Sequence, residues 1–339
     1  MNDLPMTPAA LNALRCYIDL HLHLDGSLSL ASVRHLAEMQ GIKIPESDDE
    51  VRKLLSVSAD CRDLNEYLEK FAFPGMLLQT REGLRESVRA LAEELKAEGH
   101  IYAEIRFAPQ KHCEKGLRQS EAVAAALEGL ALTDFPAQLI LCCMRGDDNH
   151  AENLETVEVA AQYLGKGVCA VDLAGAEALF PTAGFEDVFA LAKKLGVPAT
   201  IHAGEADGAE SVRAALRFGA RRIGHGIRSV EEAELMKLLA ETGVPLETCP
   251  TSNLNTVVVS DIRDYPFRKL LDAGVKLTVN TDNRSVSATD IRREFILLAE
   301  SFRLTASEVK ALLMNAAEAS FAPESLRNAL KQKIEDDFS

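Results

Sequence analysis

Short apolar runs alternate with amphipathic stretches along most of this chain. The apolar runs predict eight strands, at residues 16–21, 101–107, 138–144, 168–173, 198–202, 221–225, 244–248 and 275–280. Most of them are apolar nearly throughout, which is typical of parallel strands that are buried on both faces. Stretches with helical spacing separate nearly all of the runs, which indicates repeated βα units. Eight such units predict an α/β fold, a (β/α)8 barrel of the TIM type.

Glycines mark the ends of several predicted helices. Gly99, Gly196, Gly243 and Gly274 each lie between a helical stretch and the next apolar run. Glycine takes up the left-handed conformation that ends a helix, which other residues resist. A doubly wound open sheet is the alternative to the barrel. No G-x-G-x-x-G follows the first run, which weakens the dinucleotide-binding form of that alternative.

The connection after the first strand, about residues 24–98, is unusually long and has helical spacing. Long connections often build lids or binding walls. Within it, Leu64, Tyr67, Leu68 and Phe71 recur at helical spacing, which indicates either a helix face packed on the core or a wall over a ligand. No linker or low-complexity tract divides the chain. We therefore expect one domain, residues 1–339, with a helical lid inserted.

Composition narrows the range of partners and compartments. The formal net charge of −15 argues against nucleic acid and anionic membranes as partners, because binding to either needs a positively charged surface. Seven cysteines, an odd number without any C-x-x-C, are typical of reduced thiols. No apolar signal core and no run of transmembrane length is present. We expect a cytoplasmic protein, and the sequence predicts no oligomeric state.

The first predicted strand ends in the pair His21 and His23. Side chains two apart in a strand point the same way, so both imidazoles can converge on one point. Imidazole is the commonest protein ligand for metals. The pair alone also fits two polar residues at the place where a strand surfaces. The other strand ends must therefore supply matching ligands.

Further polar residues follow the predicted strands five, six and eight. His202 and Asp282 would complete a nitrogen and oxygen site with His21 and His23, and such a site suits one zinc ion. Each residue alone has a structural interpretation, as a hydrogen-bonded histidine or a turn aspartate. Their joint occurrence at the ends of separate strands favours the metal site. A bound water would then serve as the nucleophile of a hydrolase.

Two more residues complete the predicted chemistry. Glu205 lies three residues beyond His202 and is a candidate general acid. His225 comes from the next strand and could hold or deprotonate the water. The remaining histidines are expected to be solvated, because they lie in predicted helices or loops: His35, His100, His112 and His150.

These motifs resemble those of the adenosine deaminases of the amidohydrolase superfamily. The matching segments are His21-Leu-His23-Leu-Asp25-Gly26, His202-Ala-Gly-Glu205, Gly224-His225-Gly226, Cys249-Pro250-Thr251-Ser252-Asn253 and Asn280-Thr281-Asp282. They occur in the family's order from residue 17 to about residue 290. His-X-His alone marks only the superfamily, whereas the other segments are much more specific.

The resemblance implies one zinc per chain, bound by His21, His23, His202 and Asp282. Family members with two metals bridge them with a lysine at the end of strand four, and residues 171–175 contain none. The implied enzyme is a hydrolase acting on a cyclic amidine C–N bond, which converts adenosine, and also 2′-deoxyadenosine, to inosine and ammonia.

The resemblance also implies the residues' roles. Glu205 protonates purine N1, and His225 and Asp282 orient the activated water that attacks C6. His23 is expected beside the substrate as well as the metal. The Gly175 backbone would hold purine N3, and Asp25 would hold the ribose 5′-hydroxyl.

One position departs from many family members, which have an aspartate where this chain has Asn283. This residue is expected beside purine N7, an acceptor, to which an amide can donate at any pH. The residues at 64–71 resemble the gate helix of nucleoside-acting members, which adenine-specific relatives generally lack. A carboxylate at Asp25 would repel a 5′-phosphate, which disfavours AMP.

Other functions stay open. Another 6-aminopurine, such as adenine or an aminofutalosine-like nucleoside, could be the substrate. A metal hydrolase of a cyclic amide or ester is a more distant alternative, and so is an inactive nucleoside-binding protein. The intact ligand set with Glu205 and His225 argues against both of the latter.

Overall fold

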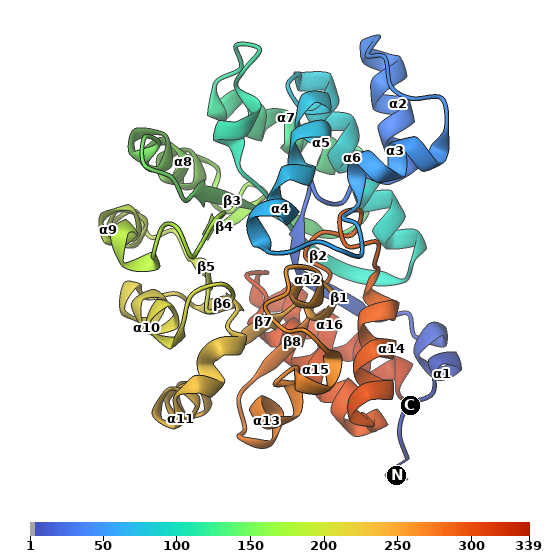
Figure 1. The fold of residues 1–339 in the computed structure, drawn as a ribbon, viewed down its shortest axis with the longest axis vertical. Coiled ribbons are helices and arrows are strands. Elements are labelled where there is room, and N and C mark those ends of the chain that lie inside the picture. Colours follow the sequence, from blue (N-terminus) through green and yellow to red (C-terminus); the bar gives the residue numbers. More distant parts are fainter. Residues whose placement is uncertain (1–3) are drawn as a thin grey trace.

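Eight parallel strands form a closed ring with helices around it in the computed structural model, which describes residues 4–339 (Figure 1). The strands are β1 (Tyr17–His23), β2 (His100–Phe107), β3 (Ala137–Met144), β4 (Val168–Ala174), β5 (Thr200–Ala203), β6 (Arg222–His225), β7 (Leu246–Thr248) and β8 (Leu277–Val279). They pair in chain order within β1–β4 and within β5–β8. Bridges between Val171 and Ala199 and between Leu22 and Asp282 join the two halves. The predicted (β/α)8 barrel is confirmed, and each predicted run overlaps one strand.

Helices connect the strands, and most of them cover the outside of the ring (Figure 1). Those after β2 are α7 (Gln119–Ala131), α8 (His150–Tyr163), α9 (Glu186–Lys194), α10 (Ala209–Phe218), α11 (Ala233–Thr242), α12 (Pro250–Asn255), α13 (Phe267–Asp272), α14 (Ile291–Phe302), α15 (Ala306–Ala319) and α16 (Glu324–Asp337). The helix-ending glycines adopt the predicted left-handed backbone, as at Gly99 (φ 88°) and Gly196 (φ 71°).

The chain enters β1 from α1 (Pro8–Ala13), and the long connection to β2 is helical over most of its length. Its elements are α2 (Leu30–Gln40), α3 (Asp48–Leu55), α4 (Leu64–Leu68), the 3-10 turn η1 (Glu69–Phe71), α5 (Ala72–Leu77) and α6 (Arg81–Ala97). Hydrogen bonds tie this connection to the loop after β8: the Val57 amide donates to the Val286 carbonyl (3.0 Å), and the Tyr67 and Ser287 hydroxyls are 2.8 Å apart. The helix α4 therefore lies over the rim at which the strands end.

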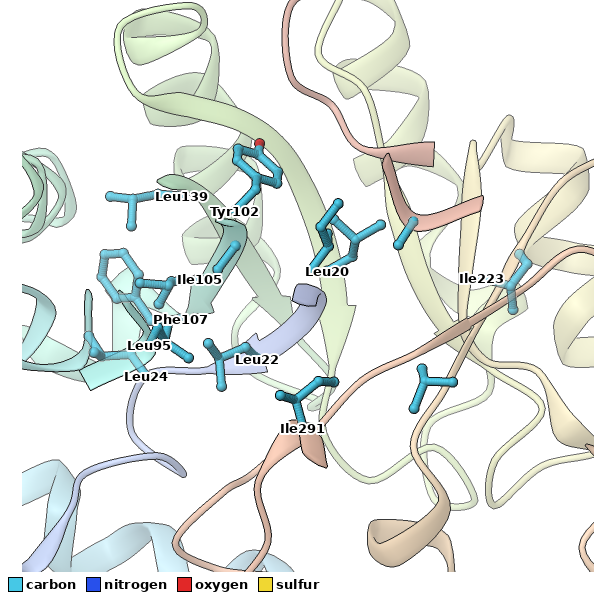
Figure 2. Close-up of a cluster of buried hydrophobic side chains, with 14 of the residues drawn as sticks. Leu20, Leu22, Leu24, Leu95, Tyr102, Ile105, Phe107, Leu139, Ile223 and Ile291 are labelled. Atoms are coloured by element: carbon cyan, nitrogen blue, oxygen red, sulfur yellow. The ribbon is translucent and has the colours of Figure 1, made fainter. Parts of the chain in front are cut away.

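One hydrophobic cluster extends from Leu11 in α1 to Ile334 in α16. Figure 2 shows part of it, with Leu22 of β1 near Ile105 and Phe107 of β2. Because side chains alternate along a strand, the leucines of β1 join this core while His21 and His23 take the other face. The apolar alternation of one strand thus directs both histidines toward the inside of the ring.

No helix within residues 4–339 is long and apolar enough to span a membrane. All seven cysteines, which lie between residues 16 and 249, are free thiols.

Candidate active site

A cavity of about 440 Å³ lies at the carboxyl ends of the strands. Its lining contains all but one of the predicted site residues: His23, Asp25, Leu64, Tyr67, Leu68, Phe71, Gly175, His202, Glu205, His225, Asp282 and Asn283. The exception is His21, which is fully buried and outside the lining. Residues from five strand ends and from the first connection therefore meet at one place.

Four candidate metal ligands come together at the base of the cavity. Ligand atoms of His21, His23, His202 and Asp282 all lie within 4.8 Å of one another. Asp282 Oδ1 is 3.3 Å from His21 Nε2 and 3.4 Å from His23 Nε2. The Nε2 atoms of His23 and His202 are 3.2 Å apart. A second grouping contains His225 and Cys249, but burial raises the pKa of that thiol well above its ordinary value, which disfavours a thiolate ligand.

Buried carboxylates orient two of these imidazoles. Glu247 Oε2 is 2.8 Å from His21 Nδ1, and Asp172 Oδ2 is 2.8 Å from His202 Nδ1. Although burial opposes its ionisation, Arg106 and Arg222 hold the pKa of the Glu247 carboxyl well below its ordinary value. An ionised carboxylate accepts the Nδ1 proton, so the Nε2 lone pair of each imidazole is left facing the cluster.

The cluster fits a metal cation. His21 Nε2 and Asp282 Oδ1 are buried and have no hydrogen-bond partner among the described residues, although they are 3.3 Å apart. Unprotonated nitrogens and a carboxylate oxygen that converge in this way repel one another unless a cation lies between them. Asp282 also adopts a left-handed backbone, with φ 59°. Such strain in a residue other than glycine is typical of functional sites.

A buried carboxylate organises the turn that carries Glu205. Glu177 accepts hydrogen bonds from the backbone amides of Gly204 (2.7 Å), Glu205 (2.9 Å), Ala206 (2.7 Å) and Asp207 (3.0 Å). The Glu205 side chain itself is buried, and this burial raises the pKa of its carboxyl to about 8. The carboxyl therefore holds a proton at neutral pH, as a general acid requires.

Asn253 links the two remaining polar groups. Its amide nitrogen is 3.2 Å from Glu205 Oε1 and 3.1 Å from His225 Nδ1, while the Tyr265 hydroxyl donates to its oxygen at 3.3 Å. This network assigns the acceptor role to Nδ1 and the proton to Nε2 of His225. Burial lowers the pKa of His225 to about 4, so the neutral ring points an N–H donor toward Asp282 Oδ2, 4.0 Å away.

Comparison with known proteins gives the same picture. A sequence model described as adenosine deaminase matches residues 17–337. The chain belongs to the adenosine deaminase family.

Relatives in this family match nearly the whole chain. A protein named adenosine deaminase from Haemophilus ducreyi is 50% identical over 330 residues, which cover 95% of this chain and 96% of the relative. One of the same name from Enterococcus faecalis is 41% identical, with 95% and 96% covered. Among solved structures, an adenine deaminase from Arthrobacter aurescens is 28% identical with a TM-score of 0.86, covering 95% of this chain and 98% of that one.

In this member of the adenosine deaminase family, Asn283 packs on Gly26. A Cβ added at Gly26 would lie 1.9 Å from Asn283 Oδ1, so only glycine fits there. Oδ1 of Asp25 and Oδ1 of Asn283 are both buried without a partner among the described residues. At Gly175 the backbone has φ 107°, which L side chains rarely adopt. These three positions of the resemblance, Asp25, Gly175 and Asn283, all line the cavity.

The four residues of the helical stripe line the cavity together. Tyr67 is buried, and it packs with Cys61 and Val286 in a small cluster of its own. Leu64 and Phe71 are partly buried against this cluster. The stripe therefore forms a wall of the cavity and anchors the connection to the loop after β8.

Two of the four histidines that were expected in solvent are exposed, and the other two are buried. His35 and His150 are exposed as predicted. His100 and His112 are buried instead. His100 begins β2, and its Nδ1 is 3.0 Å from the Leu95 carbonyl. Both His100 and His112 lie outside the predicted strand 101–107, so their burial was not predicted.

Several residues that shape this site were not singled out from the sequence for those roles. They are Arg106, Asp172, Glu177, Glu247 and Asn253. Their one signal is a charged residue within an otherwise apolar strand, as at Asp172 and Glu247, because a buried charge needs a partner. Glu177 and Asn253 lie on connections, where a polar residue is ordinary.

Proposed function

We propose that this protein is a zinc-dependent hydrolase that deaminates adenosine, and 2′-deoxyadenosine, to the corresponding 6-oxo nucleoside and ammonia. The convergence of three imidazoles and one carboxylate beside a buried, protonated Glu205 carries the proposal. Membership of the adenosine deaminase family supports it. A free nucleoside also suits a chain with a net charge of −15, which is unfavourable for nucleic acid.

His21, His23, His202 and Asp282 would hold the zinc ion. Three imidazole nitrogens and one carboxylate oxygen form a donor set that suits zinc, and a water would complete its coordination. The ligand atoms that face one another here are 3.2, 3.3 and 3.4 Å apart. When bound, the zinc ion supplies Lewis-acid activation of a water at neutral pH.

Glu205 is the proposed general acid. Its protonated carboxyl gives a proton to purine N1, which draws electron density from C6 and makes that carbon open to attack by water. Asn253 holds Glu205 Oε1 at 3.2 Å, and Glu177 fixes the backbone on which the acid is carried. The acid is therefore held in one orientation before the substrate arrives.

His225 and Asp282 are the proposed groups that orient the attacking water. The Nε2–H of His225 faces Asp282 Oδ2 at 4.0 Å, a separation that a water oxygen can bridge. The neutral ring donates to the oxygen that adds to C6, and it is not required to take up a proton. As the water oxygen becomes the 6-oxo group it gives up two protons: one passes to the amino group, which leaves C6 as ammonia, and the other restores the Glu205 carboxyl.

The remaining cavity would hold the nucleoside. Asn283 and the Gly175 backbone are the proposed contacts to the purine, and Asp25 is the proposed contact to the 5′-hydroxyl. We propose that His23 contacts the substrate as well as the metal. The wall formed by Leu64, Tyr67, Leu68 and Phe71 would exclude water as a lid of a single catalytic domain.

The test follows the ultraviolet change of purine deamination with adenosine, 2′-deoxyadenosine, adenine and AMP. We expect the zinc-loaded protein to turn over both nucleosides much faster than adenine or AMP, and a chelator to abolish the reaction. Turnover of adenine alone would support the alternative substrate instead. If no 6-aminopurine reacted with zinc-loaded protein, the proposal would be wrong.

A further inference from the structure

His112 lines the cavity, yet the proposed function gives it no role. The side chain is buried, with 1% of its surface exposed. Neither Nδ1 nor Nε2 has a hydrogen-bond partner among the described residues. A buried polar group without a partner destabilises a fold, so such groups persist where a ligand or water completes them.

Other cavity-lining residues with a buried unpaired atom already have an explanation. Asp282 Oδ1 belongs to the metal cluster, and Asp25 and Asn283 are proposed contacts to the substrate. Arg145 lacks a partner only at Nε, because its guanidinium donates to Phe180, Thr182 and His202. His112 differs from all of them in that both polar atoms of its side chain are buried and unpaired.

The loop that carries His112 is held in place from both sides. His112 ends the 3-10 turn η2 (Pro109–His112), directly after β2. The Gln79 side chain donates to the Lys111 carbonyl at 2.9 Å and accepts from the Glu114 amide at 3.1 Å. The imidazole lies 5.7 Å from the Phe107 ring, centroid to centroid. The ring is thus presented to the cavity by fixed backbone.

The chemistry of this imidazole selects its ligand. Burial lowers the pKa of His112 to about 4, so the ring is neutral at pH 7. A neutral imidazole offers one donor and one acceptor, which matches a hydroxyl group, whereas a phosphate offers acceptors alone. The strands β1 and β2 are neighbours, with His23 paired to Arg106, so the loops that carry Asp25 and His112 are adjacent.

We propose that His112 binds a hydroxyl group of the substrate's ribose and thereby contributes to selecting nucleosides over free bases. This assignment rests on the proposed nucleoside function. Asp25, on the adjacent loop, is the proposed contact to the 5′-hydroxyl, and His112 lines the same cavity as Asp25. A site built to bind a hydroxyl discriminates against analogues that lack it, because its own polar group is then left unpaired.

The test combines two variants with truncated substrates. His112→Phe keeps a planar ring beside Phe107 but removes both nitrogens, and His112→Gln keeps a donor and an acceptor. The exposed His35→Phe is the matched control. Each protein is assayed with adenosine and with its 2′-, 3′- and 5′-deoxy analogues, and thermal unfolding is recorded.

We expect His112→Phe to lower kcat/KM for adenosine about 10-fold, chiefly through KM. The loss should shrink to less than about twofold for the one analogue that lacks the contacted hydroxyl. His112→Gln should retain more activity than His112→Phe, and His35→Phe should behave as the wild type. The melting temperature of His112→Phe should not fall, because the substitution removes unpaired polar atoms and keeps the ring.

An equal loss for adenosine and all three analogues would overturn the assignment, and so would no loss for adenosine. Wild-type turnover tests the proposed function separately. If the wild type bound adenosine without deaminating it, the proposed function would fail, and calorimetric binding of the same four nucleosides would still decide the role of His112.

Discussion

Arg106 contacts the two carboxylates that orient the proposed metal ligands His202 and His21. Its removal should therefore weaken zinc binding. Its Nη1 is 2.9 Å from Asp172, which holds His202, and its Nη2 is 2.9 Å from Glu247, which holds His21. All of these side chains are buried. One guanidinium therefore fixes both carboxylates relative to each other, and Arg106→Met leaves them without it.

The two carboxylates do not depend on Arg106 to the same extent. Glu247 keeps a second guanidinium, since its Oε1 is 2.5 Å from Arg222 Nε. Asp172 has no second arginine or lysine within ion-pair distance in residues 4–339. Breaking a buried ion pair costs about 3–5 kcal/mol, and losing the support of a ligand costs about 10–100-fold in metal affinity. His202 should be affected more than His21.

Zinc affinity is measured by competition with a chromogenic chelator, and stability by urea unfolding of the metal-free protein. We expect Arg106→Met to bind zinc about 10–100-fold more weakly and to lose about 3–5 kcal/mol of unfolding free energy. The zinc affinity and stability of Arg106→Lys should lie between those of the wild type and Arg106→Met. An ammonium keeps the charge but lacks the planar guanidinium that reaches both carboxylates.

Glu104→Gln is the control. Glu104 lies in the same buried network and contacts Arg222 at 2.6 Å, but it contacts no imidazole of the proposed zinc site and neither of the carboxylates that orient them. It should lower stability and leave zinc affinity unchanged. The reasoning is refuted if Arg106→Met binds zinc as tightly as the wild type. It is equally refuted if Glu104→Gln loses as much zinc affinity as Arg106→Met.

Three further substitutions test single residues. Glu205→Gln should lower kcat by about 10²–10⁴-fold and keep zinc affinity, because the carboxyl is the proposed acid and not a ligand; a wild-type kcat would exclude that role. Asn283→Asp should stay active but lose activity as rising pH ionises the new carboxyl, since only the protonated form donates to N7; identical pH–rate profiles for the two proteins would contradict this. Burial raises the pKa of Glu294 to about 7 from its ordinary 4.5, so the folded state binds this proton more tightly and loses stability as pH rises through that range. Glu294→Gln should therefore gain about 3 kcal/mol more, relative to the wild type, at pH 8 than at pH 4, measured by urea unfolding; an equal difference at the two pH values would contradict the assignment.

The sequence predicted the ring of strands and the cavity-lining residues for one physical reason. Parallel strands that are covered on both faces must be apolar, and the carboxyl ends of all of them meet at one rim. A polar residue directly after such a run, such as His202, Glu205 or Asp282, has few places to lie other than that rim. His112 was wrongly expected in solvent, because it follows its strand by five residues, and a loop of that length can face either way.

The network beneath the metal cluster was beyond prediction for a different reason. Arg106, Asp172 and Glu247 lie within strands β2, β4 and β7, and each could be expected to need a buried partner. The strands that carry them are not neighbours in the ring, so their side chains meet only across its interior. Which carboxylate reaches Arg106 depends on the stagger of the strands around the barrel. The apolar pattern of one strand predicts only the face on which a side chain lies. It does not predict how far neighbouring strands are staggered.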